Sequence, residues 1–359
     1  MPSPVQRVLI YRLGSLGDTV VALPALHLVA RTFPDAERRM LTNFPVSAKA
    51  PAAAAILGDS GLVHGYFRYN VGTRSVFALL HLVWTLVRWR PQVLVYLAGA
   101  RGIPAAERDA RFFRLCGIRR QIGVPLTQEM QKHEIQPEHG TLEYEYERLA
   151  RNLSVLGDCE AETQAAWDLK LTAEEKTCAQ EALAAAEGRS ILAVGVGTKV
   201  QSKDWGKENW KALLADLGAR YPHYALALMG AAEEAEVSEF AAEGWRGGAG
   251  PQAVVLNLCG RLSPRESAAA LAHADLFLGH DSGPMHLAAT VGTRCMAVFS
   301  ARDLPRVWFP RGENHHVIYH PVNCMNCRLE TCIVERKKCL TSISVAEVAY
   351  AVRSMLEPA

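Results

Sequence analysis

The chain has 359 residues, a formal net charge of +2, 49% hydrophobic residues and 21% charged residues. This length accommodates two domains with separate cores, and the composition is typical of a globular protein. A net charge so close to zero gives no reason to expect nucleic acid as a partner. Arginines gather at 108–120 and at 302–311, so the sequence is still compatible with a local basic surface.

The longest apolar run, residues 76–87, is too short to cross a bilayer, which takes roughly 20 apolar residues. The N-terminus lacks the layout of a signal peptide, because its apolar stretch at 8–10 soon reaches Gly17 and Asp18. Nine cysteines are compatible with a reducing compartment. We therefore expect a cytoplasmic protein, with peripheral contact at the inner membrane as an open alternative.

Short apolar runs alternate with longer helical patterns, which predicts parallel sheets covered by helices. In the first half the pattern predicts strands over 8–12, 39–42, 63–68 and 93–97, and helices over 19–32, 75–89 and 142–156. In the second half it predicts strands over 190–196, 224–229, 254–257, 276–279 and 295–300, and helices over 208–220, 233–243, 264–273 and from 284. The weakly patterned, acidic segment 157–170 indicates a linker. The sequence thus predicts two doubly wound α/β domains across a cleft, with ligands at the carboxyl ends of the strands.

The first predicted strand runs directly into Gly14-Ser15-Leu16-Gly17-Asp18. Glycines allow a tight turn and the close approach of a ligand. Asp18 falls at the start of a helix, where it is either an N-cap worth about 1 kcal/mol or a carboxylate that takes up a proton. A dinucleotide site is disfavoured, because the pattern is not G-x-G-x-x-G and an aspartate there repels a pyrophosphate.

The second motif, residues 279–286, reads Gly-His-Asp-Ser-Gly-Pro-Met-His at the end of another strand. Pro284 suits the first helical turn, and the N–H groups of 282–285 with the helix dipole can hold a diphosphate. Asp281 either fixes the turn or accepts a ligand hydroxyl. His286 either donates to a phosphate or sugar hydroxyl or is a satisfied core histidine.

A third loop, between the strand over 190–196 and the helix over 208–220, contains Lys203. A lysine at such a place can neutralise a phosphate as a point charge, although a plain surface lysine is the usual case. Its position in a strand-to-helix loop makes Lys203 a candidate for the same diphosphate.

Together these residues resemble glycosyltransferase family nine, the group that contains the lipopolysaccharide heptosyltransferases. The resemblance extends from about residue 7 to about residue 350. It is carried by Arg12-Leu13-Gly14-Ser15-Leu16-Gly17-Asp18, Gly197…Lys203-Asp204-Trp205…Asn209-Trp210, Asp281-Ser282-Gly283-Pro284-Met285-His286-Leu287-Ala288-Ala289 and Cys324-x-x-Cys327…Cys332…Cys339-Leu340.

The resemblance implies a GT-B architecture of two Rossmann-like domains facing a central cleft. The N-terminal domain, 1–160, would bind the acceptor and the C-terminal domain, 161–340, the nucleotide sugar. A C-terminal helix over 341–359 would follow, and its packing back on the N-terminal domain is left open. The resemblance also implies inversion at the anomeric carbon without a catalytic metal or other cofactor.

The resemblance also implies roles for residues. Asp18 would be the general base. Ser15 and Gly17 would line the acceptor side, where Arg68, Arg74 and Arg101 are candidate contacts for acceptor phosphates or carboxylates. The candidate donor-binding residues are Thr198, Lys203, Glu233, Glu234, Asp281, Ser282, Gly283, Met285 and His286, with one of the two glutamates on the ribose hydroxyls. Gly206 stands where proline is common in the family, which bears on the sugar and base of the donor.

Two features stay open between a structural and a functional interpretation. Cys324, Cys327, Cys332 and Cys339 have ligand-like spacing, so they are either the ligands of a structural zinc or iron ion or reduced structural thiols. The helix over 75–90 is either an ordinary core-facing helix or an amphipathic face that rests on the membrane surface.

The function that the resemblance implies is transfer of a sugar, heptose from ADP-heptose, to a hydroxyl of a lipopolysaccharide or related surface-glycan acceptor. The expected partners are a nucleotide-sugar donor and a lipid-linked or glycan acceptor, without nucleic acid. The alternatives are a nucleotide-sugar epimerase of the same architecture, a protein O-heptosyltransferase and a non-catalytic nucleotide-sugar- or metal-binding protein.

Overall fold

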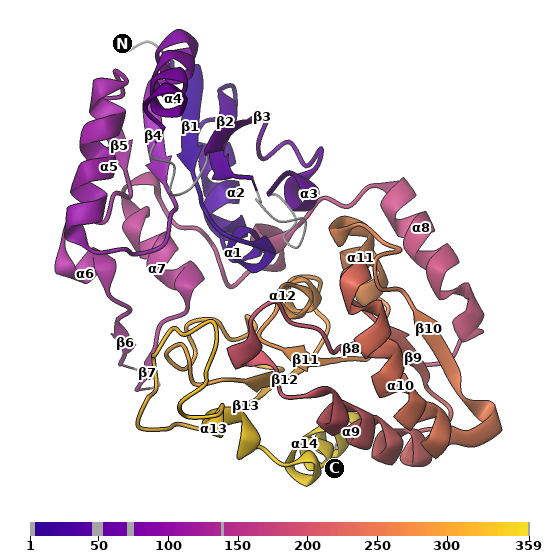
Figure 1. Ribbon diagram of the computed structural model, residues 1–359. Helices are drawn as coiled ribbons and strands as arrows, with labels where there is room; N and C mark the ends of the chain where they lie inside the picture. Colours follow the sequence, from indigo (N-terminus) through magenta and orange to yellow (C-terminus); the bar gives the residue numbers. More distant parts are fainter. Residues whose placement is uncertain (1–3, 45–52, 70–74, 138–139, 358–359) are drawn as a thin grey trace. The chain divides into compact units, whose positions relative to one another are not determined.

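The computed structural model describes residues 4–44, 53–69, 75–137 and 140–357. The chain forms two compact units, Met1–Lys170 and Leu171–Ala359, each with its own parallel sheet (Figure 1). The predicted α/β class with two doubly wound sheets is thus confirmed. Arg74, a predicted acceptor contact, lies outside the described residues.

The sheet of the N-terminal unit has five parallel strands in the spatial order β3-β2-β1-β4-β5. They are β1 (Arg7–Tyr11), β2 (Glu37–Asn43), β3 (Gly65–Tyr69), β4 (Val93–Tyr96) and β5 (Arg120–Ile122). The sequence pattern predicted the first four, and the short, polar β5 was missed. Because β2 and β4 flank β1 on opposite sides, the strand order reverses there, and ligands bind at the carboxyl ends of strands at such a point. The turn after β1, with Asp18, lies at this edge.

The helices of this unit are α1 (Leu16–Val20), α2 (Leu23–Thr32), α3 (Ala53–Leu57), α4 (Val76–Trp89), α5 (Ile103–Leu115), α6 (Gln128–Gln131) and α7 (Glu145–Asn152). The single helix predicted over 19–32 is wrong, because the chain breaks between α1 and α2 and a proline enters the first turn of α2. The helix predicted over 142–156 is shorter, because an antiparallel hairpin of β6 (Ile135–Gln136) and β7 (Thr141–Leu142) precedes α7. In the part of the chain that the structure describes, no helix is long and apolar enough to cross a membrane.

The sheet of the C-terminal unit has six parallel strands in the order β10-β9-β8-β11-β12-β13. They are β8 (Ile191–Gly195), β9 (Ala225–Leu228), β10 (Val254–Asn257), β11 (Leu276–His280), β12 (Cys295–Phe299) and β13 (His316–Tyr319). The order reverses between β8 and β11. The loops that follow these two strands contain the second and third sequence motifs.

The helices of this unit are α8 (Ala173–Leu183), α9 (Lys207–Arg220), α10 (Ala235–Ala249), α11 (Pro264–Leu271), α12 (Gly283–Thr290), α13 (Lys338–Thr341) and α14 (Val345–Leu356). Helix α14 packs on α9 and β12, and its residues Val348 and Val352 are fully buried in the core of this unit. Arg353 also pairs with Asp216 of α9 at 3.4 Å. The apolar residues Val348 and Val352 of the C-terminal helix are therefore part of the core of its own unit.

Candidate active site

The turn after β1 holds Asp18 in a defined position. Ser15 is the N-cap of α1 and Asp18 the third residue of the helix, so the N-cap interpretation of Asp18 is wrong by three residues. The backbone N–H and the hydroxyl of Ser15 donate to Oδ2 of Asp18 at 2.7 and 2.9 Å. The Asp18 side chain stays 29% exposed. The carboxylate is therefore fixed by its own helix start and still accessible to a ligand.

Arg12, at the end of β1, supports the Asp18 turn from inside the unit. It is 1% exposed, and its guanidinium donates to the carbonyl oxygens of Asp18 and Leu97. Its Nη2 also lies 3.6 Å from Oδ1 of Asp18. Burial lowers the pKa of Arg12, whereas the charges of Asp18 and Glu145 oppose that shift. An arginine stays protonated in any case, so a permanent positive charge stands behind the Asp18 carboxylate.

Gly14 and Asn43 fix the other side of the turn. Asn43, the last residue of β2, accepts from the Gly14 N–H at 2.7 Å and donates to the Gly14 carbonyl at 3.2 Å. The φ of Gly14 is +141°, and a Cβ built there would lie 2.2 Å from Cγ of Asp18. Only glycine fits this place, because a side chain would occupy the position of the carboxylate.

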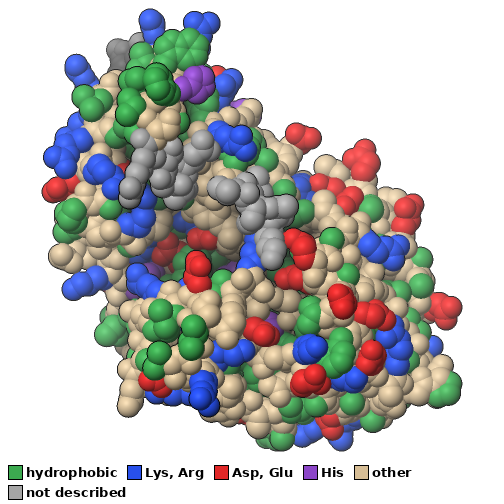
Figure 2. Space-filling model, in the orientation of Figure 1, with side chains coloured by type: hydrophobic (Ala, Val, Ile, Leu, Met, Phe, Trp, Pro, Cys, Tyr) green, Lys and Arg blue, Asp and Glu red, His purple; other side chains and the backbone are tan. Residues whose placement is uncertain are grey.

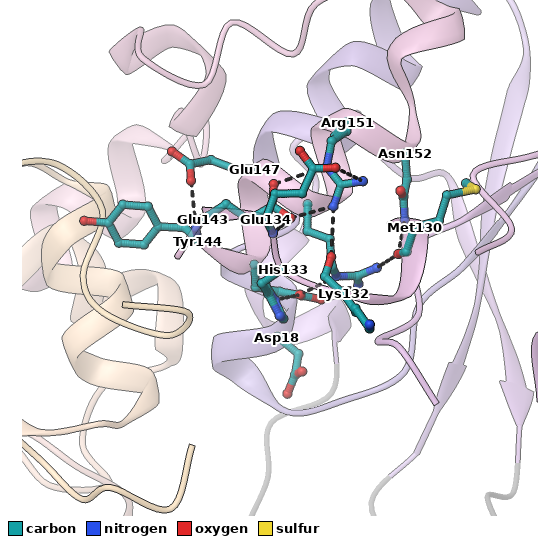
Figure 3. Close-up of polar contacts among 12 residues, drawn as sticks. Asp18, Met130, Lys132, His133, Glu134, Glu143, Tyr144, Glu147, Arg151 and Asn152 are labelled. Atoms are coloured by element: carbon teal, nitrogen blue, oxygen red, sulfur yellow. Dashed lines mark hydrogen bonds and ion pairs between the residues drawn. The ribbon is translucent and has the colours of Figure 1, made fainter. Parts of the chain in front are cut away.

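Helix α7 and the segment before it form a charge network near the Asp18 turn. Figure 3 labels His133, Glu143 and Arg151 of this network together with Asp18. Glu145 accepts two bonds from Arg148, at 2.8 and 2.7 Å, and Nε2 of His133 lies 3.0 Å from the same carboxylate. Burial alone would raise the pKa of Glu145, but Arg148, His133 and Arg12 lower it to about 2. Arg12 thus interacts with Asp18 and with a second carboxylate whose pKa is low.

The predicted acceptor contacts lie in different environments. Ser15 is exposed and Gly17 buried. Arg101, after β4, is tied down by Asp109 at 2.5 Å and by the Tyr96 hydroxyl at 3.1 Å, and burial raises the pKa of Tyr96 to about 12. Arg68, in β3, stands over the ring of Phe44 and lines a pocket of about 300 Å³ between β3 and α4.

In the C-terminal unit, two predicted donor residues meet. Nζ of Lys203 lies 2.5 Å from Oδ2 of Asp281, with both side chains largely buried. Asp281 directly precedes Ser282, the N-cap of α12, whose buried hydroxyl has no hydrogen-bond partner among the residues that the structure describes. Gly283 begins the helix and is partly exposed. A cation, an unused hydroxyl and a helix N-terminus therefore lie together at the carboxyl end of β11, as an anion site requires.

Two histidines flank this helix start. His280, which the motif contained but we did not single out, is fully buried, and its Nε2 accepts from the N–H of Trp205 at 3.0 Å and from the indole of Trp210 at 3.2 Å. Burial lowers the pKa of His280 to about 4, so the ring is neutral with its proton on Nδ1. His286 is 5% exposed and lies edge-on to Trp308. Met285 is fully buried, so only its backbone is available to a ligand.

The structure distinguishes the two glutamates after β9. Glu233 is exposed, whereas Glu234 turns back to accept from the N–H of Ala231 at 2.8 Å. A Cβ on Gly197 would lie 2.2 Å from Cδ of Glu234, so the carboxylate lies against the end of β8. Burial raises the pKa of Glu234. Thr198 is half-buried. It follows Gly197 in the chain and so lies near the same edge of the sheet, after the end of β8.

The cysteine segment, residues 324–339, packs on the Lys203 loop. The N–H and hydroxyl of Ser202 donate to the carbonyls of Glu330 and Leu329, at 3.1 and 2.5 Å. The N–H of Cys332 donates to Gln201 at 2.9 Å. All four cysteines are free and half-buried, and within the described ranges no three His, Cys, Asp or Glu side chains form a metal-binding group. Zinc or iron ligation by these four cysteines, which their spacing suggested, therefore stays a prediction.

Two Rossmann-like units, each with polar side chains at the carboxyl ends of its strands, are the organisation of a two-domain α/β transferase. The chain belongs to glycosyltransferase family 9 (heptosyltransferase), whose sequence model matches residues 120–338. The resemblance stated from the motifs is thereby confirmed.

Individual relatives agree with this membership. The chain is 22% identical to lipooligosaccharide heptosyltransferase 2 of Campylobacter jejuni, over 95% of this chain and 96% of that protein. A glycosyltransferase family 9 structure from Veillonella parvula superposes with a TM-score of 0.72 at 16% identity, covering 100% of this chain and 99% of that one. The ADP-heptose lipopolysaccharide heptosyltransferase II of E. coli gives 0.64 at 15% identity, covering 98% of each chain. These likenesses confirm the predicted GT-B class of fold.

Proposed function

We propose that this protein is an inverting glycosyltransferase that moves heptose from ADP-heptose to a hydroxyl of a lipopolysaccharide-type acceptor without a catalytic metal. The observation that carries the proposal is the accessible Asp18 carboxylate, held by Ser15 at the carboxyl end of β1. The family and the names of its relatives support a heptosyl donor. Residues 1–160 would bind the acceptor and residues 161–340 the donor.

In this mechanism the acceptor hydroxyl gives its proton to Asp18 while its oxygen forms a bond to the anomeric carbon. The bond from that carbon to the diphosphate oxygen breaks on the opposite side, and ADP leaves with the electron pair, so the configuration inverts. A positioned base typically contributes ~100- to 10,000-fold to such a step. Asp18 thus needs to be ionised and aligned, which the contacts of Ser15 and Arg12 support.

The negative charge that develops on the leaving diphosphate needs a counter-charge. Lys203 carries a positive charge, and the N-terminus of α12 with the Ser282 hydroxyl adds hydrogen-bond donors. Asp281 holds Lys203 in place before the donor binds. His286 would add a donor to phosphate or sugar, and Glu234 rather than Glu233 would accept from the ribose hydroxyls. In this proposal these groups, rather than a metal ion, offset the charge of the leaving diphosphate.

The test is Asp18→Asn, which keeps the shape of the side chain and removes its basicity. We expect transfer from ADP-heptose to fall at least about 100-fold while ADP binding, measured by calorimetry, stays within a few-fold. Asp35→Asn, at an exposed aspartate of the same unit, is the matched control and should leave both unchanged. Unchanged turnover in Asp18→Asn would refute the assignment of the base.

Two further measurements separate this proposal from its alternatives. An epimerase converts the nucleotide sugar without an acceptor, so analysis of the donor incubated alone distinguishes the two enzymes. Transfer that continues at full rate in a strong chelator supports a reaction without a metal. Comparison of a lipid-linked glycan with a peptide acceptor separates lipopolysaccharide synthesis from protein O-heptosylation.

A further inference from the structure

Helix α4 exposes a stripe of large apolar side chains. Phe77 is 85% exposed, Val76 64%, Trp84 59%, Leu80 58% and Val87 47%. Their spacing of three, four and seven residues places them along one side of the helix. Figure 2 shows the corresponding green side chains gathered at the top of the view, where Figure 1 draws α4. We name these five side chains the α4 stripe.

The α4 stripe is not the core-facing side of the helix. Leu82, Leu86 and Trp89 are buried and pack with strand residues in the core of the N-terminal unit. The helix therefore already packs on its sheet through another apolar face, and the core of the unit does not use the α4 stripe. Exposed apolar patches of this kind mark interaction surfaces.

The charges around the α4 stripe are positive. The helix has no acidic residue, and Arg88 and Arg90 are exposed at its end. The Arg88 guanidinium lies 5.6 Å from the centre of the Trp84 ring, within the stripe itself. Arg68 adds a third exposed cation beside the pocket that β3 forms with α4.

Helix α5 extends this positive field on the same face of the sheet. Residues of α4 and α5 share one core with the sheet, so both helices cover the same side of it. Outward from that core, α5 exposes Arg108, Arg111 and Arg114, at spacings of three residues, against one exposed acidic residue, Glu107. A combination of aromatic and aliphatic side chains with arginines is what an anionic lipid surface binds, since the apolar groups enter the headgroup boundary and the cations meet the phosphates.

We propose that the α4 stripe and the flanking arginines dock the N-terminal unit on an anionic lipid bilayer. The inference deepens the proposed function, because a membrane-anchored acceptor would then lie on the side of the domain that binds it. It does not require that function, since docking is measured without donor or acceptor. A second copy of the chain and a partner protein are the other occupants that the experiment distinguishes.

The experiment is sedimentation of the full chain with vesicles of phosphatidylcholine, with and without phosphatidylglycerol. We expect binding only to the anionic vesicles, weakened by salt. Phe77→Ser with Trp84→Ser should weaken it at least about tenfold. Val155→Ser with Val334→Ser, which removes two side chains that are 79% and 90% exposed elsewhere, is the matched control and should bind like the original chain.

A second readout follows Trp84 directly. It is the one exposed tryptophan of seven, so lipid-induced blue shift and quenching by brominated lipid report on the α4 stripe. Failure of the original chain to bind anionic vesicles would overturn the proposal. So would equal binding by the stripe variant and the control. Loss of a dimer on sedimentation analysis of the stripe variant, without lipid binding by the original chain, would assign the surface to a second copy instead. Transfer to a soluble acceptor fragment should be unchanged in the stripe variant, which separates this outcome from failure of the proposed function.

Discussion

Replacement of Gly14 by alanine tests how the Asp18 turn works. Two separate penalties meet at this residue: the backbone has a φ of +141°, and the new Cβ would lie 2.2 Å from Cγ and 2.6 Å from Oδ2 of Asp18. The first penalty strains the backbone of the fold. The second pushes the carboxylate away from the Ser15 hydroxyl that holds it.

A second glycine separates these penalties. Gly117, in the same unit, has a φ of +87°, and nothing lies within 4 Å of a Cβ built there. Left-handed backbone at a non-glycine residue costs about 1–3 kcal/mol. We therefore expect Gly14→Ala and Gly117→Ala each to lower the midpoint of thermal unfolding by roughly 2–12 °C, at about 2–4 °C per kcal/mol.

Only Gly14→Ala displaces the proposed base. Its kcat should fall about 100- to 10,000-fold, the contribution of a general base, while the kcat of Gly117→Ala stays near that of the original chain. The assay is steady-state transfer at a temperature where both variants are folded, with ADP binding as the check on the donor side. A folded Gly14→Ala variant with the kcat of Gly117→Ala would refute the reasoning, because the position of the carboxylate would then not matter.

Three other predictions concern the charges and the donor side. The pKa of Glu145 is lowered to about 2, so its ionised form stabilises the fold at pH values above the ordinary pKa near 4.5. This contribution is lost as the pH falls from 4.5 towards 2. The midpoint of thermal unfolding should therefore fall less steeply with decreasing pH in Glu145→Gln than in the original chain. Lys203→Met leaves the buried Asp281 without its cation, so we expect a lower unfolding midpoint and at least about tenfold weaker ADP binding by calorimetry, since one lost charge-assisted contact exceeds 1.4 kcal/mol. Gly197→Ala places a Cβ against Glu234 and should weaken donor binding, whereas Gly247→Ala, with nothing within 4 Å, should not.

The sequence pattern located the catalytic candidates because they follow strands. Once alternating strands and helices are recognised, polar residues directly after a strand must lie at its carboxyl end. This argument placed Asp18 after β1, Lys203 after β8 and Asp281 after β11, and the structure pairs the last two directly. The two candidate donor loops could be brought together because they follow neighbouring strands, β8 and β11.

The supports of these residues could not be predicted in the same way. Asn43 is 29 positions from Gly14, which it clamps. Glu145 reaches the neighbourhood of Arg12 only because α7 packs against α2, after a hairpin that the helical pattern concealed. A buried charge such as Arg12 has no periodic signal, since its partners are backbone carbonyls set by the path of the chain. The residues that position Asp18 and its turn therefore become visible only with the tertiary structure.

The cysteine segment has contacts that its spacing does not predict. Two short spacings, Cys324 to Cys327 and Cys327 to Cys332, predict ligands only if the chain between them folds around an ion. The segment also uses its backbone carbonyls to hold Ser202, next to Lys203, and Lys337 donates to the carbonyl of Asp204 at 2.7 Å. The loop that contains Lys203 is thus fixed by residues more than a hundred positions later in the chain, through backbone carbonyls that every sequence has and no motif records.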